Sequence, residues 1–121
     1  MNDNSAVSTF LNTQSLVELQ GLLGDDLFDI TGLFAQQVRL DAAQLQAQAA
    51  QADWPALART AHAVKGSAGN LGAQALSQWA ANTEKAALAG NATAVAQALP
   101  ALPGLVEQTL TTLRDGGFLR D

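Results

Sequence analysis

Apolar side chains recur at steps of three and four residues along most of the chain, and no segment alternates apolar and polar residues with a period of two. Steps of three and four place side chains on one face of an α-helix, whereas a half-buried strand requires alternation. The chain is therefore predicted to be all-α. The predicted apolar faces are, in chain order, Leu16, Leu19, Leu22 and Leu23; Leu27, Ile30, Phe34, Val38 and Leu45; Trp54, Leu57, Ala61, Val64, Ala68 and Leu71; Leu76, Trp79, Ala80, Thr83 and Ala87; and Val95, Leu99, Leu102, Val106, Leu110 and Leu113.

Polar and glycine residues between these faces predict the ends of the first two helices. Thr13 is the expected N-cap of a short first helix, which Gly24 ends, because a hydroxyl accepts a hydrogen bond from an unpaired backbone N–H and glycine tolerates the left-handed conformation. Asp25 and Asp26 are expected to cap a longer helix that runs to about Gln51.

The third predicted helix contains the only histidine of the chain, His62. Asp53 caps it, and Pro55 lies in its first turn, where a missing N–H is harmless. We expect this helix to run to about Gly69, with residues 70–72 forming the turn into a fourth helix.

Glycine and proline residues interrupt the apolar pattern in the C-terminal third of the chain. Gly90 ends the fourth helix and Asn91 begins the next, so these two helices should form a tight antiparallel hairpin. Pro100 and Pro103 lie inside the last apolar pattern, and proline both removes a backbone donor and clashes with the preceding turn. The final helix should therefore kink or split near Pro100.

Short loops between amphipathic helices of these lengths predict an antiparallel four-helix bundle with a short additional N-terminal helix. We expect a flexible N-terminus over residues 1–12, a helical bundle domain over residues 13–115, and a C-terminal tail over residues 116–121 in which Phe118 and Leu119 could dock on the bundle.

Composition narrows the classes of function. Hydrophobic residues make up 48% of the chain and charged residues 14%, enough for one core. The net charge of -5 argues against nucleic-acid binding, and the absence of cysteine together with a single histidine argues against a metal site. No signal peptide or apolar span is recognisable, so a cytoplasmic protein with no membrane insertion is expected. We also expect a monomer with no cofactor of its own.

The helical face around His62 is nearly bare. At about 100° per residue, Gly66 and Gly69 fall within roughly 40° of His62, as does Ala58, whereas the apolar side chains cluster on the far side. Each glycine inside a helix costs about 1 kcal/mol relative to alanine. The imidazole should therefore face solvent, and the two glycines suggest that a partner protein approaches there.

Two cations flank the histidine. Arg59 and Lys65 lie three residues before and after His62, within reach of a negative group on the ring. Lys65 is the stronger candidate because it neighbours the glycines; for Arg59, an ordinary solvated charge is an equal alternative.

Glu84 lies on the flank of the fourth helix, from which it can approach His62. A carboxylate that accepts the Nδ1 proton would leave the Nε2 lone pair free to attack an electrophile. An ordinary surface charge is again the alternative.

Other chemistries fit poorly. Ser67 lies about 140° round the helix from His62, which is unsuitable for a nucleophile and base pair, and packing near the turn is its simpler role. Residues 66–72, GSAGNLG, match neither GxGxxG nor a P-loop, and no strand precedes them.

The segment AHAVKGSAGNLG over residues 61–72, with Thr83-Glu84-Lys85-Ala86 further on, resembles the histidine-containing phosphotransfer (HPt) domain family of bacterial multistep phosphorelays. Residues 22–26 with Phe34, and Asp53-Trp54, add to a likeness that extends from about residue 15 to residue 113.

The resemblance implies that His62 is the phosphoacceptor at Nε2, that Lys65 assists the phosphoryl group, that Gly66 lets a receiver domain approach, and that Glu84 orients the ring. It further implies a stoichiometric phosphocarrier, not an enzyme, whose partners are response-regulator receiver domains bearing Mg²⁺ and a hybrid sensor histidine kinase. Family members usually have a continuous final helix, unlike this chain, and Arg59 is not a family position.

Two alternatives stay open. A helical bundle could bind receiver or kinase domains without being phosphorylated, although the exposed histidine disfavours this. The dimerisation and phosphoacceptor domain of a histidine kinase would need an acidic residue directly after the histidine, where Ala63 stands.

Overall fold

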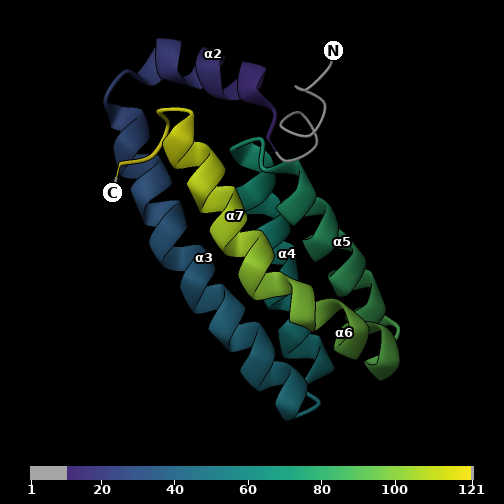
Figure 1. Ribbon diagram of the computed structural model, residues 1–121. Helices are drawn as coiled ribbons and strands as arrows, with labels where there is room; N and C mark the ends of the chain where they lie inside the picture. The colour runs from purple at the N-terminus through teal and green to yellow at the C-terminus, as the bar shows by residue number, and fades with distance from the viewer. Residues whose placement is uncertain (1–10, 121) are drawn as a thin grey trace.

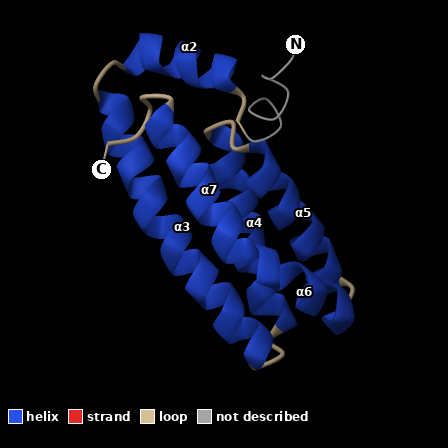
Figure 2. Ribbon diagram, in the orientation of Figure 1, coloured by secondary structure: helices blue, strands red, loops and turns tan. Residues whose placement is uncertain are grey.

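Every regular element in residues 11–120, the part of the chain that the computed structural model describes, is helical, as Figure 2 shows. The prediction of an all-α fold is therefore confirmed. The elements are α2 (Thr13–Leu23), α3 (Asp26–Ala50), α4 (Trp54–Asn70), α5 (Gln74–Leu88), α6 (Ala92–Ala98), a 3-10 turn (Leu99–Ala101) and α7 (Leu102–Asp115).

The long helices lie side by side, and α2 crosses one end of them (Figure 1). Helix α4 contacts both α3 and α5, and α7 also contacts both of them. The side chains between the helices form one apolar core whose largest fully buried members include Leu27, Leu45, Leu57, Leu76 and Leu110. The helix that bears His62 is thus supported on two sides and open on the remaining one.

The start of α2 differs from the prediction. The N-cap is Asn12, whose side chain accepts a hydrogen bond from the Ser15 N–H at 3.2 Å, and Thr13 is already the first helical residue. The Asn12 N–H also donates to the carbonyl of Gly72 at 2.6 Å, which ties α2 to the turn between α4 and α5. Asn12 is the better cap because its side-chain amide oxygen accepts from the first turn of α2 while its backbone N–H donates to the turn at Gly72.

Two residues of the predicted apolar faces are exposed. Leu22 is 82% exposed and Ile30 is 43% exposed, whereas Leu16 and Leu27 are fully buried. Leu22 lies about 120° round α2 from Leu16, and Ile30 lies about 60° from the centre of the buried face of α3. Both residues therefore lie at or beyond the edge of the helix face that packs on the core. A second correction concerns Asp25, which precedes α3 without making a side-chain capping bond.

The ends of the predicted third and fourth helices are confirmed. Asp53 Oδ1 accepts from the Ala56 N–H at 3.3 Å, and Pro55 lies in the first turn of α4. Gly90 has φ +67° after α5, and Asn91 caps α6. Asp53 and Pro55 thus mark the start of α4, and Gly90 and Asn91 lie between the end of α5 and the start of α6.

The predicted interruption of the last helix is also confirmed. Helix α6 ends at Ala98, Pro100 lies in the 3-10 turn, and α7 starts at Leu102 with Pro103 in its first turn. Pro103 needs no hydrogen-bond donor there, because the first N–H groups of a helix have no intrahelical partner.

Both termini of the described range pack on the bundle. Phe118 and Leu119 are buried, and the Phe118 carbonyl accepts from Thr31 Oγ1 at 2.8 Å. Leu11 is buried as well. Of the N-terminal segment expected to be flexible, residues 1–10 lie outside the described residues, and the domain limits at residues 13 and 115 remain predictions.

One surface ion pair joins α3 to α7. Arg39 donates from Nε and Nη2 to the two carboxylate oxygens of Glu107, at 3.0 and 2.9 Å. These hydrogen bonds hold the pKa of Glu107 below its ordinary value. Both side chains are at least half exposed, so the pair adds little to stability.

Candidate functional site

His62 projects from the open side of α4. Its side chain is 65% exposed, whereas Leu57, Ala61 and Val64, on the other side of the same helix, are buried in the core. The capped start of α4 and its apolar face fix the rotation of the helix, and this rotation turns the imidazole outward. The predicted exposure of the ring is observed.

The ring is oriented by a carboxylate on the neighbouring helix. His62 Nδ1 lies 2.9 Å from Glu84 Oε2, and the Glu84 side chain is only 19% exposed. An ionised carboxylate only accepts hydrogen bonds, so we assign the proton of the neutral ring to Nδ1. In this tautomer Nε2 has a free lone pair directed away from Glu84, which suits it for nucleophilic attack.

The same carboxylate also holds a lysine. Lys65 Nζ lies 3.5 Å from Glu84 Oε1, so the two oxygens of Glu84 contact two groups on α4. The structure thus brings together His62, Lys65 and Glu84, three residues that the sequence singled out.

Ser77 is a site residue that the sequence analysis missed. Its Oγ donates to the carbonyl of Lys65 at 3.0 Å, across the interface between α4 and α5. Ser77 and Glu84 are seven residues apart, two helical turns, and so lie on the same face of α5. Together they attach α5 to α4 at two points beside His62, and this spacing is the signal that could have identified Ser77.

The two glycines after His62 have different surroundings. A Cβ atom at Gly66 would meet nothing within 4 Å, whereas a Cβ at Gly69 would lie 3.4 Å from Ser77 Oγ. Gly66 therefore leaves open surface next to the imidazole. Gly69 is also exposed, but it borders α5, where a Cβ would make an ordinary van der Waals contact with Ser77.

Arg59 lies on the rim of a shallow cleft between α4 and α5 that also includes His62 and Glu84. Its side chain is exposed and makes no ion pair or hydrogen bond with any residue in the range 11–120. The cleft is otherwise lined by Pro55, Ala58 and Leu88. Arg59 is thus available to an anion that arrives at His62.

Ser67 makes a local bond. Its Oγ donates to the carbonyl of Val64 at 3.3 Å, a bond within α4. The hydroxyl has no contact with His62 among the described residues, in agreement with the poor geometry for a hydrolase.

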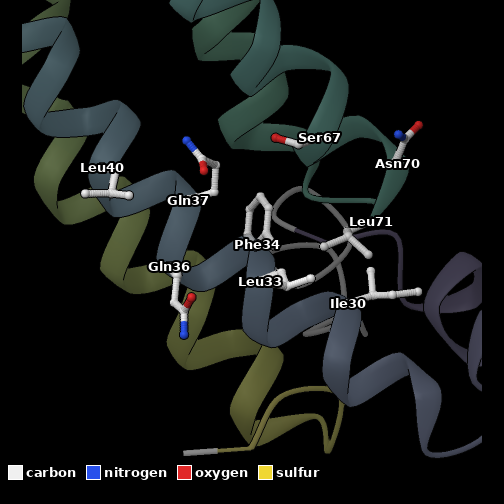
Figure 3. A pocket seen from close by; sticks show the side chains of 9 residues that line it. All are labelled: Ile30, Leu33, Phe34, Gln36, Gln37, Leu40, Ser67, Asn70 and Leu71. Carbon is white, nitrogen blue, oxygen red and sulfur yellow. The ribbon is translucent and has the colours of Figure 1, made fainter.

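An apolar groove lies between α3 and the C-terminal end of α4 (Figure 3). On α3 it is lined by Ile30, Leu33, Phe34, Gln36, Gln37 and Leu40, and on the other side by Ser67 and Asn70 of α4 and by Leu71 directly after this helix. Leu33 and Leu40 are about two thirds exposed, and none of the lining side chains is charged. On α4 the lining of the groove begins at Ser67, which directly follows Gly66 in the sequence.

Residues 11–120 offer neither a metal site nor a membrane span. This range contains no group of three His, Cys, Asp or Glu side chains arranged to hold a metal ion. None of its helices has the length and apolar character that a bilayer crossing requires.

The described residues thus form a helical bundle with an exposed histidine that a carboxylate contacts through Nδ1 and two cations flank. The model of the Hpt domain family matches residues 29–116, more than half of the chain, and the chain belongs to this family. The matched range includes His62 and every residue placed around it above. Membership of the family implies histidine phosphotransfer in phosphorelays.

Comparisons with curated proteins and with solved structures found no match.

Proposed function

We propose that this protein relays a phosphoryl group between receiver-domain aspartates of a two-component phosphorelay, by way of a phosphohistidine at His62. The observation that best supports this is the 2.9 Å contact of His62 Nδ1 with Glu84 on a ring that is otherwise exposed. In the neutral ring this contact favours the proton on Nδ1, so that Nε2, on an exposed side chain, carries the lone pair that in-line attack on phosphorus requires.

In the forward step, the Nε2 lone pair forms a bond to phosphorus as the bond from phosphorus to the aspartate oxygen breaks. The receiver regains its free carboxylate, and the proton on Nδ1 stays in place. The imidazole acquires positive charge in this step, and Glu84 stabilises it because the carboxylate is already in position. Transfer to a second receiver follows the same path in reverse.

The receiver supplies most of the catalytic groups in this proposal, including the Mg²⁺ that neutralises the phosphoryl oxygens. This chain supplies a nucleophile whose rotation and tautomer are fixed. We therefore propose a stoichiometric carrier, with no autonomous kinase or ATPase activity and no cofactor of its own.

Partner docking is supported by two surfaces. Gly66 leaves room for another backbone beside the imidazole, and the groove along α3 offers exposed leucines to an apolar helix face. We propose that response-regulator receiver domains and a hybrid sensor histidine kinase bind here. Because no lining residue of the groove is charged, docking there should depend weakly on salt.

The remaining parts of the proposal concern the state of the protein. We propose that α3, α4, α5 and the α6–α7 segment form an antiparallel four-helix bundle with α2 as a short additional N-terminal helix; the short connections and the contacts of α4 and α7 with both neighbours support this. We further propose a cytoplasmic monomer that does not bind nucleic acid, in keeping with the net charge of -5.

The test is phosphotransfer from a phosphorylated receiver domain. The protein should acquire phosphate that is labile in acid and stable in base, and a second receiver should remove it. His62→Gln should take up none while keeping its helical circular dichroism. Tight receiver binding without transfer would favour instead the interaction module that is never phosphorylated.

A further inference from the structure

The site contains two cations, and the structure places them in different situations. Lys65 is bound to Glu84 through its ammonium group. Arg59 is exposed and has no partner among residues 11–120, although it lines the same cleft as His62. Which of them meets a phosphoryl group on His62 therefore depends on where that group lies.

Helix geometry separates the two side chains. Arg59 and Lys65 lie about 60° to either side of His62 around α4, one turn before it and one turn after it. Lys65 is on the side that faces α5, as its contact with Glu84 shows. Arg59 is on the opposite flank of His62 from Lys65, and it lines the cleft that His62 shares with Glu84.

The ring orientation places a phosphoryl group on the side of Arg59. Nδ1 is directed at Glu84 on α5, so Nε2, at the other side of the ring, points away from that helix. A phosphoryl group on Nε2 would therefore lie away from the ammonium of Lys65. Side chains three residues apart on a helix are neighbours, so the long side chain of Arg59 can reach such a group.

Charge balance supports the same assignment. A phosphoryl group adds up to two negative charges beside the negative Glu84, and like charges at such distances repel. Lys65 already offsets the charge of Glu84, and moving its ammonium group to the phosphoryl group would leave that charge unbalanced. The phosphoryl group then needs a second cation, and a guanidinium can donate two parallel hydrogen bonds to its oxygens.

We propose that Arg59 binds the phosphoryl group of phospho-His62, while Lys65 stays paired with Glu84. This inference rests on the proposed function, because it needs His62 to be the phosphoacceptor. It reverses the order expected from the sequence alone, in which Lys65 was the stronger candidate. When the phosphorus–nitrogen bond breaks, negative charge moves from the phosphoryl oxygens to the departing nitrogen. Arg59 stabilises this charge in the intact phosphohistidine more than in the transition state, so it would lengthen the lifetime of the phosphorylated carrier.

The test uses phosphoramidate in place of a receiver. His62 Nε2 forms the bond to phosphorus, the phosphorus–nitrogen bond of the reagent breaks, and ammonia leaves. The half-life of phospho-His62 and the pH titration of its ³¹P chemical shift are then measured for the wild type, Arg59→Gln, Arg59→Lys, Lys65→Gln and Lys85→Gln. Lys85 is the matched control, an exposed cation next to Glu84 in sequence but outside the cleft.

Arg59→Gln should shorten the half-life of phospho-His62 several-fold and move the midpoint of the ³¹P titration to higher pH. Both values for Arg59→Lys should lie between those of Arg59→Gln and the wild type. Both values for Lys85→Gln should match the wild type. An unchanged half-life and titration in Arg59→Gln, or larger changes in Lys65→Gln than in Arg59→Gln, would overturn the proposal for Arg59 and leave the proposed function standing. A wild-type protein that phosphoramidate cannot modify at His62 would contradict the proposed function itself, and this inference with it.

Discussion

The carboxylate of Glu84 should accelerate phosphotransfer, and Glu84→Gln tests this with the smallest change in shape. The amide oxygen of glutamine can still accept a hydrogen bond from the Nδ1–H group, so the ring keeps a hydrogen-bond partner. What disappears is the negative charge that faces the imidazole as it becomes positive, together with the partner of Lys65. The substitution therefore isolates the contribution of charge.

The size of the effect follows from the geometry. A hydrogen bond to a charged group contributes about 1.5–3 kcal/mol, and one between neutral groups about 0.5–1.5 kcal/mol. The difference of about 1–1.5 kcal/mol is an upper value here, because His62 is 65% exposed and water screens the pair. A loss of about 1 kcal/mol in the transition state corresponds to a rate lower by roughly five-fold.

The assay is a single-turnover measurement of phosphoryl transfer from a phosphorylated receiver, with the carrier in excess. Glu18→Gln, an exposed glutamate on α2, is the matched control and should transfer at the wild-type rate. ¹⁵N NMR of the imidazole provides an independent readout, with Nδ1 protonated in the wild-type neutral ring. Equal rates for Glu84→Gln and Glu18→Gln, or a proton on Nε2 in the wild type, would refute the reasoning.

Four further outcomes are expected. Gly66→Ala should raise the free energy of unfolding by about 0.5–1 kcal/mol, as seen by denaturant titration, whereas Gly66→Trp should fold but transfer slowly, since nothing in the molecule fills that space; an unaltered transfer rate in Gly66→Trp would count against docking there. Leu33→Ser should raise the KM for the receiver and leave modification by phosphoramidate unchanged, and an unchanged KM would remove the groove from the docking surface. Ala52→Gly should stabilise the fold by about 1 kcal/mol because Ala52 has φ +54° in the turn before α4, and a lower melting temperature would contradict this. Glu107→Gln should slightly lower the free energy of unfolding at neutral pH, because it removes the pair with Arg39. This pair stabilises the fold above the ordinary glutamate pKa and is lost as the pH falls through the lowered pKa of Glu107 in the folded protein, so the two proteins should become equally stable in acid. A difference in stability that grows in acid would contradict this.

The helices and most of their ends could be predicted because the responsible signals are local. Asp53 and Asn91 cap helices through atoms three residues away, and Pro100 interrupts a helix through its own ring. The choice of Asn12 over Thr13 was not local, because the Asn12 backbone also bonds the turn at Gly72.

The contact of Glu84 with His62 could be predicted because α4 and α5 form a hairpin. Ala73, in the turn, is midway in the sequence between His62 and Glu84, and also midway between Gly69 and Ser77. Helices of equal rise place such pairs opposite each other. The same count places Ser77 opposite Gly69, beside the helix that bears His62.

The groove could not be predicted from one face of one helix. Periodicity shows which side of α3 is buried, but whether Leu33 and Leu40 are covered depends on how far α4 extends beside them. Their spacing with Ile30 forms a second apolar stripe on α3, and such a stripe is the sequence signal for an exposed docking surface.

The most direct test of the account is to locate the phosphate after incubation with a phosphorylated receiver, by ¹H–¹⁵N correlation NMR with coupling to ³¹P. The account predicts a single phosphorylated site, at Nε2 of His62, with the proton still on Nδ1 beside Glu84. Phosphate on Nδ1, on another residue, or on none would contradict it.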